Sequence, residues 1–447
     1  MLTHQEQDAD VIVIGAGIIG ISCALRLQQA GKKVLVLDTK GVAAETSAGN
    51  AGAFAFADVI PLATPGILRK APKWLLDPLG PLSIRPAYVL KLLPWLWRFW
   101  RASWQYKYAT ALAAQANLMS FSKDALERQI QSTKGEALIR REGQLQLYEG
   151  EKKFQAALAS WQTRQEHGVV FELLESPDAI ARIQPGIHPR FTHAAFTPEW
   201  KNVVDPKVWT EHLAQAFVAL GGQVETACVD QIRLLEDGVS VLKQKSQQHT
   251  QQDPQQDLQQ GKAKQLVIAA GAWSKPLAAQ LGDTLPLDTE RGYNTTLPAG
   301  SFKLRTHLTF SNHGFVVTKV QDKIRVGGAV ELAGLTLAPN YQRAQHLLDK
   351  AKRFLPELDP IQRDSSLSQH RSAQHTPPQQ WMGFRPSMPD SLPVIDYASR
   401  TQQVVYAFGH GHLGLTQSAG TAELVCELLH NQTTSIDLSP YSAKRFT

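Results

Sequence analysis

Three glycines near the N-terminus have the spacing of a turn that binds a nucleotide pyrophosphate. Gly15, Gly17 and Gly20 directly follow the β-branched run 11–14, and a helical pattern comes next. Gly15 permits the tight turn, Gly17 leaves room for the pyrophosphate, and Gly20 lets the helix pack closely on the strand. The helix N-terminus would bind the phosphates, and Asp38, which ends the next apolar strand, could accept both ribose hydroxyls. This order predicts an adenine dinucleotide site, with an ordinary strand–helix turn as the weaker interpretation.

Three further segments favour FAD over NAD, because FAD is long and needs contacts from distant parts of a chain. Residues 45–52 are small and polar, the apolar strand 265–270 ends in glycine, and 409–416 form a glycine-rich turn before a helix at about 417–429. A helix N-terminus at that last turn would place a positive dipole end near the flavin pyrimidine. Each segment alone is more commonly a plain loop, but together they indicate FAD. An NAD-dependent dehydrogenase would leave residues 409–414 without a role.

Composition narrows the function classes. The 447 residues carry a formal net charge of +6 with dispersed cations, which argues against nucleic-acid binding. The three cysteines are far apart and have no metal-ligand spacing, so we expect no metal site, no disulfide framework and a reducing compartment. The run 11–23 has an acidic flank and internal glycines, unlike a signal peptide. We expect a cytoplasmic protein, with a peripheral position on the cytoplasmic face of the membrane as the alternative.

Hydrophobic periodicity then predicts the elements that position these residues. The predicted strands and helices are strands 11–14, 34–37, 224–229, 239–242, 265–270, 291–297, 315–319, 324–329 and 404–408, and helices 21–30, 206–220 and 417–429. Asp205 and Pro206 are a typical helix start. The Gln-rich stretch 244–264 is interpreted as a solvated hairpin extension without chemistry, with a partner-binding loop as a minor alternative.

Four runs of residues carry a resemblance to a known family. They are 72–78 (PKWLLDP), 287–293 (LDTERGY), 383–393 (GFRPSMPDSLP) and 408–414 (FGHGHLG). The chain resembles the D-amino-acid oxidase superfamily of FAD enzymes, specifically its D-amino-acid dehydrogenase branch and the glyphosate oxidoreductase-like group within that branch. The Gln-rich stretch near residue 250 departs from this pattern.

The resemblance implies an α/β fold, α+β overall, in which a Rossmann-like FAD-binding domain accompanies a discontinuous second domain built on an antiparallel sheet. The FAD-binding domain would comprise 8–60, 188–287 and 380–447. The substrate domain would comprise 61–187 and 288–379.

FAD would be held without a covalent bond, with the backbone of Val229 at the adenine and 47–52 along the pyrophosphate and isoalloxazine. The predicted cofactor-binding residues are Gly15, Gly17, Ile19, Gly20, Asp38, Thr39, Thr46, Ser47, Gly49, Asn50, Ala51, Gly52, Val229, Ala270, Gly271, Trp273, Gly411, His412, Leu413, Gly414, Leu415 and Thr416.

The resemblance also suggests the catalytic residues. Arg385 lies in the strand that carries the carboxylate-binding arginine in the oxidases, and arginine suits a bidentate carboxylate. Tyr293 could donate to the same carboxylate, and a half-buried strand aromatic is an equal alternative. His410 and His412 could tune the pKa of the substrate amine, although a backbone-organising role suits them better.

The predicted reaction is oxidative deamination, with hydride transfer from the α carbon to flavin N5. The imino acid would hydrolyse to a keto acid and ammonia. A D-amino-acid dehydrogenase is the first hypothesis, with a quinone or respiratory-chain acceptor. A secondary-amine oxidoreductase acting on an N-substituted glycine or a cyclic imino acid is the second. A nucleotide-binding protein that docks a membrane or partner is the alternative outside enzymes.

A Trp-rich helical insert at about 85–110 supports two interpretations. Tryptophans alternate with Lys and Arg over 87–108, as in a helix that lies at the headgroup level of a membrane. The same spacing suits an amphipathic helix with its tryptophans in the core and its cations at the rim. Peripheral membrane contact therefore remains an open alternative.

Overall fold

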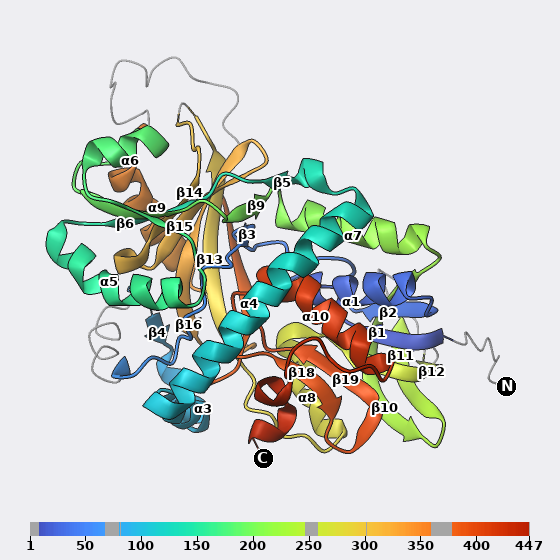
Figure 1. The fold of residues 1–447 in the computed structure, drawn as a ribbon. Helices are drawn as coiled ribbons and strands as arrows, with labels where there is room; N and C mark the ends of the chain where they lie inside the picture. The colour runs from blue at the N-terminus through green and yellow to red at the C-terminus, as the bar shows by residue number, and fades with distance from the viewer. Residues whose placement is uncertain are drawn as a thin grey trace.

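Two β-sheets and the helices that cover them form the molecule (Figure 1). This computed structural model describes residues 9–67, 80, 82–245, 258–300, 302–358 and 378–446. The resembling run 72–78 and the middle of the Gln-rich stretch lie outside the described residues. None of the described helices is both long and apolar enough to cross a membrane.

The first sheet has seven strands in the order β1-β2-β10-β11-β12-β19-β18, with a further pairing of β1 and β12. Their bounds are β1 Ala9–Ile14, β2 Val34–Asp38, β10 Gln223–Leu235, β11 Gly238–Lys245, β12 Leu258–Ile268, β18 Val394–Ala398 and β19 Thr401–Phe408. Strands β10, β2, β1, β12 and β19 run parallel, whereas β11 and β18 are antiparallel to their neighbours. The central strands are buried on both faces, which explains why they read as continuous apolar runs.

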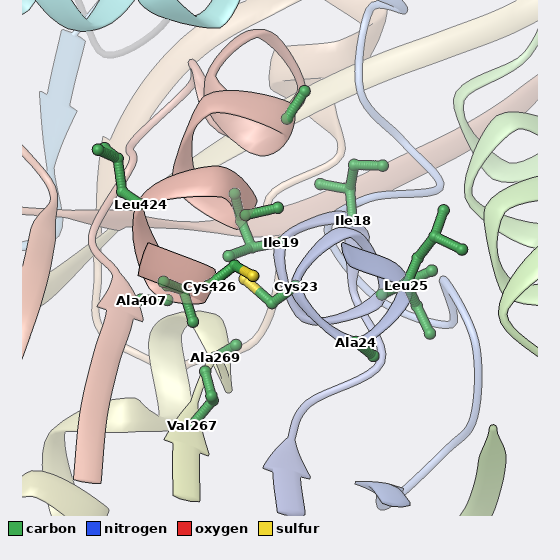
Figure 2. Packing of buried hydrophobic residues seen from close by; sticks show 14 of the residues in the cluster. Ile18, Ile19, Cys23, Ala24, Leu25, Val267, Ala269, Ala407, Leu424 and Cys426 are labelled. Atoms are coloured by element: carbon green, nitrogen blue, oxygen red, sulfur yellow. The ribbon is translucent and has the colours of Figure 1, made fainter. Parts of the chain in front are cut away.

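Helices α1 Ile18–Gln29, α7 Pro206–Ala219 and α10 Gly414–Leu429 cover one face of this sheet. Figure 2 shows Cys23 of α1 beside Cys426 of α10, above Val267 of β12, and both thiols are free. The predicted cap of α7 is confirmed, because Asp205 accepts the Lys207 N–H at 2.8 Å. Helix α8 Ser274–Gln280 lies on the other face.

The second sheet has nine strands in the order β17-β13-β16-β15-β14-β6-β8-β7, with β4 also paired to β16. Their bounds are β4 Leu82–Ile84, β6 Gln144–Tyr148, β7 Glu172–Leu174, β8 His193–Thr197, β13 Asp288–Pro298, β14 His307–Phe310, β15 Phe315–Val320, β16 Lys323–Leu332 and β17 Gln379–Ser387. Most pairs are antiparallel, and the predicted β15–β16 hairpin is confirmed. Helix α9 Gln342–Phe354 packs against this sheet, and α5 Glu151–Glu166 and α6 Pro177–Ile183 lie at its β6–β8 end.

A small third sheet of β3 Ala53–Phe54, β9 Lys201–Val203 and β5 Ile139–Arg140 links the other two. The strands differ from the predicted domain boundaries at two points. Strands β8 and β17 fall inside the predicted FAD-binding ranges 188–287 and 380–447, yet both pair within the nine-stranded sheet. Pairing partners decide sheet membership, and here the partners lie far away in the sequence.

The Trp-rich insert forms two helices rather than one. Helix α3 Val89–Ala102 ends at Ser103, whose hydroxyl donates to the Trp100 carbonyl at 2.7 Å, and helix α4 Gln105–Thr133 follows. Helix α10 begins three residues before the predicted start at Gln417, because Gly414 already takes part in its first turn.

Candidate functional site

The glycine turn between β1 and α1 has the tight geometry that its sequence predicts. Gly15 has φ +110°, and a Cβ there would lie 2.4 Å from the Ala269 carbonyl oxygen. A Cβ at Gly20 would lie 1.9 Å from the Gly15 carbonyl oxygen. The helix can therefore pack this closely on the strand only because residue 20 has no side chain. Gly17, the N-cap of helix α1, has no side chain, and the first turn of the helix contains no acid. Apart from the Ile18 N–H, which Ser47 accepts, the N–H groups of this turn and the positive dipole end suit an anionic pyrophosphate.

Asp38 stands at the end of β2 and organises the same region. Its Oδ2 accepts the Ala16 N–H at 2.8 Å, and its Oδ1 accepts the N–H groups of Lys40 and Gly41 at 2.8 and 2.9 Å. The carboxylate therefore ties the glycine turn to the loop after β2. Its position at the end of β2 suits contact with a ribose.

A cavity of about 500 Å³ opens at this turn. Fifteen of the predicted cofactor-binding residues line it: Gly15, Gly17, Ile19, Asp38, Thr39, Thr46, Ser47, Asn50, Val229, Ala270, Gly271, Trp273, Gly411, Gly414 and Leu415. Seven others do not: Gly20, Gly49, Ala51, Gly52, His412, Leu413 and Thr416. Residues that the sequence reasoning missed also line it, among them Lys40, Cys228, Pro276 and Pro386. Segments from both ends of the chain thus enclose one elongated space, which fits a dinucleotide.

The polar loop 45–52 is held in place from both sides. On the nucleotide side, Ser47 Oγ accepts the Ile18 N–H at 3.0 Å. On the other side, the Thr46 hydroxyl donates to the Phe384 carbonyl at 2.8 Å. Thr46 and Ser47 therefore join the first turn of α1 to strand β17 of the second sheet.

Two residues of the second sheet, which the sequence reasoning missed, bind the same loop. Arg325 donates to the carbonyls of Ala48 and Asn50 at 3.2 and 2.6 Å, and the Asn294 amide donates to the Gly49 carbonyl at 2.9 Å. Arg325 lies about 275 residues from this loop in sequence, so no local pattern could have found it. The loop is consequently fixed to the sheet that carries the candidate substrate site.

Gly49 also has a packing role beside its predicted cofactor contact. A Cβ at Gly49 would lie 2.3 Å from the Trp381 ring, and a Cβ at Gly383 would lie 1.9 Å from it. Trp381 therefore occupies the space between the loop and the sheet, and both glycines are needed to admit its ring.

Arg385 lies on the face of the second sheet that is turned toward this loop. It pairs with Glu290 across β17 and β13, and alternation along these strands puts it on the same face as Trp381. Its Nη1 donates to the Ala329 carbonyl at 3.1 Å, and among the described residues no acidic oxygen lies within 4 Å of the guanidinium. Burial lowers its pKa from the usual value and nearby Glu290 opposes the shift, yet an arginine remains protonated. Arg385 is a cation available for an anionic group.

Tyr293 does not converge with Arg385 on one carboxylate in this structure. Tyr293 pairs with Met382, three residues before Arg385, so the two side chains point to opposite faces of the sheet. Its hydroxyl donates to Glu331 Oε2 at 2.5 Å and accepts the Asn340 N–H at 3.0 Å. Burial raises the pKa of Tyr293 to about 12. The phenol proton is thus committed to Glu331 and cannot serve the predicted contact.

His410 is buried and lines the cavity. Its Nε2 lies 2.9 Å from the Thr421 hydroxyl, and burial lowers its pKa to about 3. It forms a bridge with Ser387, and the next residue, Gly411, donates its N–H to Pro386 at 2.7 Å. His410 is therefore neutral and suited to holding the turn rather than carrying a proton.

His412 lies close enough to Arg385 for the two charges to influence each other. Its side chain is exposed to solvent, yet the surrounding protein lowers its pKa while the carboxylates of Asp58 and Glu290 oppose that shift. The neighbouring Leu413 packs against Ala57 and so brings the Asp58 segment to the same place. One guanidinium, one imidazole and two carboxylates thus gather here.

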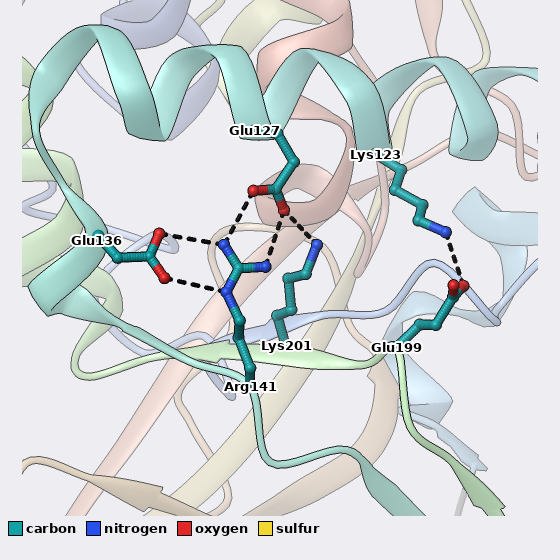
Figure 3. Close-up of polar contacts among 6 residues, drawn as sticks. All are labelled: Lys123, Glu127, Glu136, Arg141, Glu199 and Lys201. Carbon is teal, nitrogen blue, oxygen red and sulfur yellow. Dashed lines mark hydrogen bonds and ion pairs between the residues drawn. The ribbon is translucent and has the colours of Figure 1, made fainter.

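A charged cluster holds strand β9, which pairs with the strand that follows the loop (Figure 3). Arg141 binds Glu127 at 2.9 Å and Glu136 at 3.0 Å, and Lys201 of β9 also binds Glu127. Arg141, with Lys201 in support, lowers the pKa of Glu127 to about 2. The cluster ties α4 to β9, whose partner β3 continues the loop 45–52.

Comparisons with known proteins agree with this geometry. A family model described as FAD dependent oxidoreductase (DAO) matches residues 10–428. The chain is 34% identical over 441 residues to a D-amino-acid oxidase of Bradyrhizobium diazoefficiens, covering 98% of both chains. It is 30% identical over 426 residues to a D-amino acid dehydrogenase of Xylella fastidiosa, covering 94% of this chain and 91% of that one.

Solved structures share the fold. Glycine oxidase from Geobacillus kaustophilus has a TM-score of 0.73 and 19% identity, covering 98% of this chain and 99% of that one. Iminodiacetate oxidase from Chelativorans sp. has a TM-score of 0.69 and 18% identity, covering 97% and 98%. On the family match and the identity to these relatives, the chain belongs to the DAO family of FAD-dependent oxidoreductases.

Proposed function

We propose that this FAD-dependent oxidoreductase is a D-amino-acid dehydrogenase. It would remove a hydride from the α carbon and the amine proton from an amino acid, giving an imino acid that water converts to a keto acid and ammonia. The observation that carries the proposal is the position of Arg385, which lies on the sheet face turned toward the polar loop 45–52. Among the described residues, no acidic oxygen lies within 4 Å of its guanidinium. The D-amino-acid specificity of two relatives supports the choice of substrate.

Arg385 binds the substrate carboxylate in this proposal. Its planar fork matches a carboxylate in two parallel hydrogen bonds, and the enclosed site strengthens both. The Ala329 carbonyl holds one nitrogen of the guanidinium and so fixes the orientation of the rest. FAD, when bound without a covalent link in the cavity at the glycine turn, supplies the acceptor for the hydride.

His412 takes the proton that the substrate amine must lose. An amino acid arrives as an ammonium ion, and hydride departure from the α carbon requires the neutral amine. The surrounding protein lowers the pKa of His412, so the imidazole is neutral and a ring nitrogen can accept the ammonium proton. Asp58 and Glu290 would stabilise the imidazolium that forms.

A secondary amine is the second candidate substrate. An N-substituted glycine offers the same carboxylate to Arg385, and one of the proteins of the same fold is an iminodiacetate oxidase. Loss of a hydride and a proton from such a substrate would give an imine, and water would then hydrolyse its C=N bond to give glyoxylate and an amine. A quinone or respiratory-chain acceptor is proposed for the electrons, because a relative is a dehydrogenase.

An anaerobic flavin-bleaching screen tests the proposal. The purified yellow protein is mixed with D-amino acids, L-amino acids, cyclic imino acids and N-alkyl glycines, and the flavin absorbance is followed. Bleaching by D-amino acids at the lowest concentrations supports the first candidate. Preferential bleaching by N-alkyl glycines or cyclic imino acids supports the second, and no bleaching by any of them contradicts both. Reoxidation by a soluble quinone compared with oxygen then identifies the acceptor.

A further inference from the structure

Helix α3 lies at the margin of the molecule (Figure 1), and several of its apolar side chains are exposed. Leu90 is 81% exposed, Leu93 50% and Trp97 57%, at the i, i+3, i+7 spacing of one helix face. The surface continues past the end of the helix, where Trp104 is 39% and Tyr106 61% exposed. Five large exposed apolar side chains within 17 residues make this segment a candidate for an interaction surface.

The opposite face of α3 is the one that packs against the rest of the protein. Leu92 and Trp95 are buried against Leu332 of β16, and the Trp95 indole N–H points at the Ser387 carbonyl at 3.4 Å. Trp95 also stacks on Phe99 with ring centroids 5.2 Å apart. The predicted core role thus holds for Trp95. Trp97 lies in solvent, although the buried face of the helix is already packed without it.

Basic residues surround the exposed apolar side chains. Lys91, Arg98, Arg101 and Lys107 are all exposed, and the sequence has no acidic residue from 78 to 123. Arg101 lies over the Trp104 ring at 5.5 Å from its centroid. Aromatic side chains surrounded by cations, with no acidic residue nearby, are complementary to a surface with an anionic outer layer and an apolar interior.

We infer that α3 and the first turn of α4 bind the surface of an anionic phospholipid bilayer. Leu90, Leu93 and Trp97 would enter the acyl boundary, and the four cations would contact lipid phosphates. The described helices include none that could span the bilayer, so this contact is peripheral. Because Trp95 reaches Ser387, two residues from Arg385, the contact would hold the candidate substrate site close to the membrane.

Vesicle co-sedimentation of the flavin-loaded protein tests this inference. We expect binding to vesicles of phosphatidylglycerol and phosphatidylcholine, at least about tenfold weaker binding to phosphatidylcholine alone, and a decline with salt, because each basic residue near an anionic surface contributes about fivefold to binding. Leu90→Glu combined with Trp97→Glu should weaken binding to the anionic vesicles at least about tenfold. Arg98→Glu combined with Arg101→Glu should do the same.

Val218→Glu combined with Leu220→Glu is the matched control, since these side chains are 52% and 50% exposed but lie at the end of α7. This variant should bind vesicles like the parent protein. Flavin content and thermal midpoint check that every variant folds. The inference is overturned if the parent protein does not sediment with anionic vesicles at low salt, or if the Leu90 and Trp97 variant binds as well as the control. Flavin bleaching by amino acids is measured separately, so failure of this inference is distinguishable from failure of the proposed function.

Discussion

Gly292 is the position at which the role of Arg385 can be tested without changing its charge. Gly292 lies beside Arg385 on the same sheet face, and a Cβ there would lie 2.3 Å from Arg385 Nη2 and 2.5 Å from Cζ. Carbon and nitrogen atoms in contact are about 3.5 Å apart, so Gly292→Ala must displace the guanidinium by about 1.2 Å. Because a misplacement of about 1 Å can cost about 100-fold in rate, we expect kcat/KM to fall about 100-fold, or about 2.7 kcal/mol.

The assay is steady-state turnover with the best substrate from the bleaching screen. Gly261→Ala is the control, because it adds the same methyl group inside strand β12, where the nearest atom is 3.3 Å away. That variant should keep kcat/KM within about twofold of the parent, as expected for a change away from the site. The reasoning is refuted if Gly292→Ala, with full flavin content and an unchanged thermal midpoint, retains the parent kcat/KM.

Three further predictions concern the cofactor, the proton and the charged cluster. Asp38→Ala should weaken FAD binding about tenfold or more, since it removes the acceptor of the Ala16 N–H, and flavin fluorescence titration measures this. His412→Gln should remove a low-pKa acidic limb from the pH profile of kcat/KM, and an unchanged profile would exclude His412 as the proton acceptor. Glu127→Gln should lower the free energy of unfolding by about 1 kcal/mol at pH 7. The folded pKa of Glu127 is about 2 against an ordinary value of 4.5, so its contribution is present above pH 4.5 and lost toward pH 2. Denaturant unfolding should therefore show the two proteins converging as the pH falls, and a constant difference would contradict this assignment.

Local features of the site could be predicted from the sequence. The glycine turn was recognisable from the local pattern of one strand, three glycines and one helix, although the residue that crowds Gly15 is the distant Ala269. The end position of Asp38 and the cap at Asp205 are likewise set by their immediate neighbours. In each case the sequence signal lies within a few residues or one strand–helix–strand unit.

Features that depend on strand register could not be predicted. Tyr293 and Arg385 belong to neighbouring strands, and a shift of one residue in their pairing would have put them on the same face. Arg325 contacts the polar loop 45–52 only because the fold places strand β16 beside that loop. For α3, the helical pattern was visible, but which tryptophan is buried depends on Leu332, about 240 residues away in the chain.

Anaerobic reduction of the bound flavin in an Arg385→Met variant tests the central claim most directly. Arg233→Met, an exposed arginine on β10, is the matched control. We predict that both variants retain FAD and that substrate reduces the control like the parent protein. In the Arg385 variant the second-order rate of reduction should fall by about 1,000-fold, because the carboxylate loses its charged partner. Reduction of the Arg385 variant as fast as the control would contradict the account.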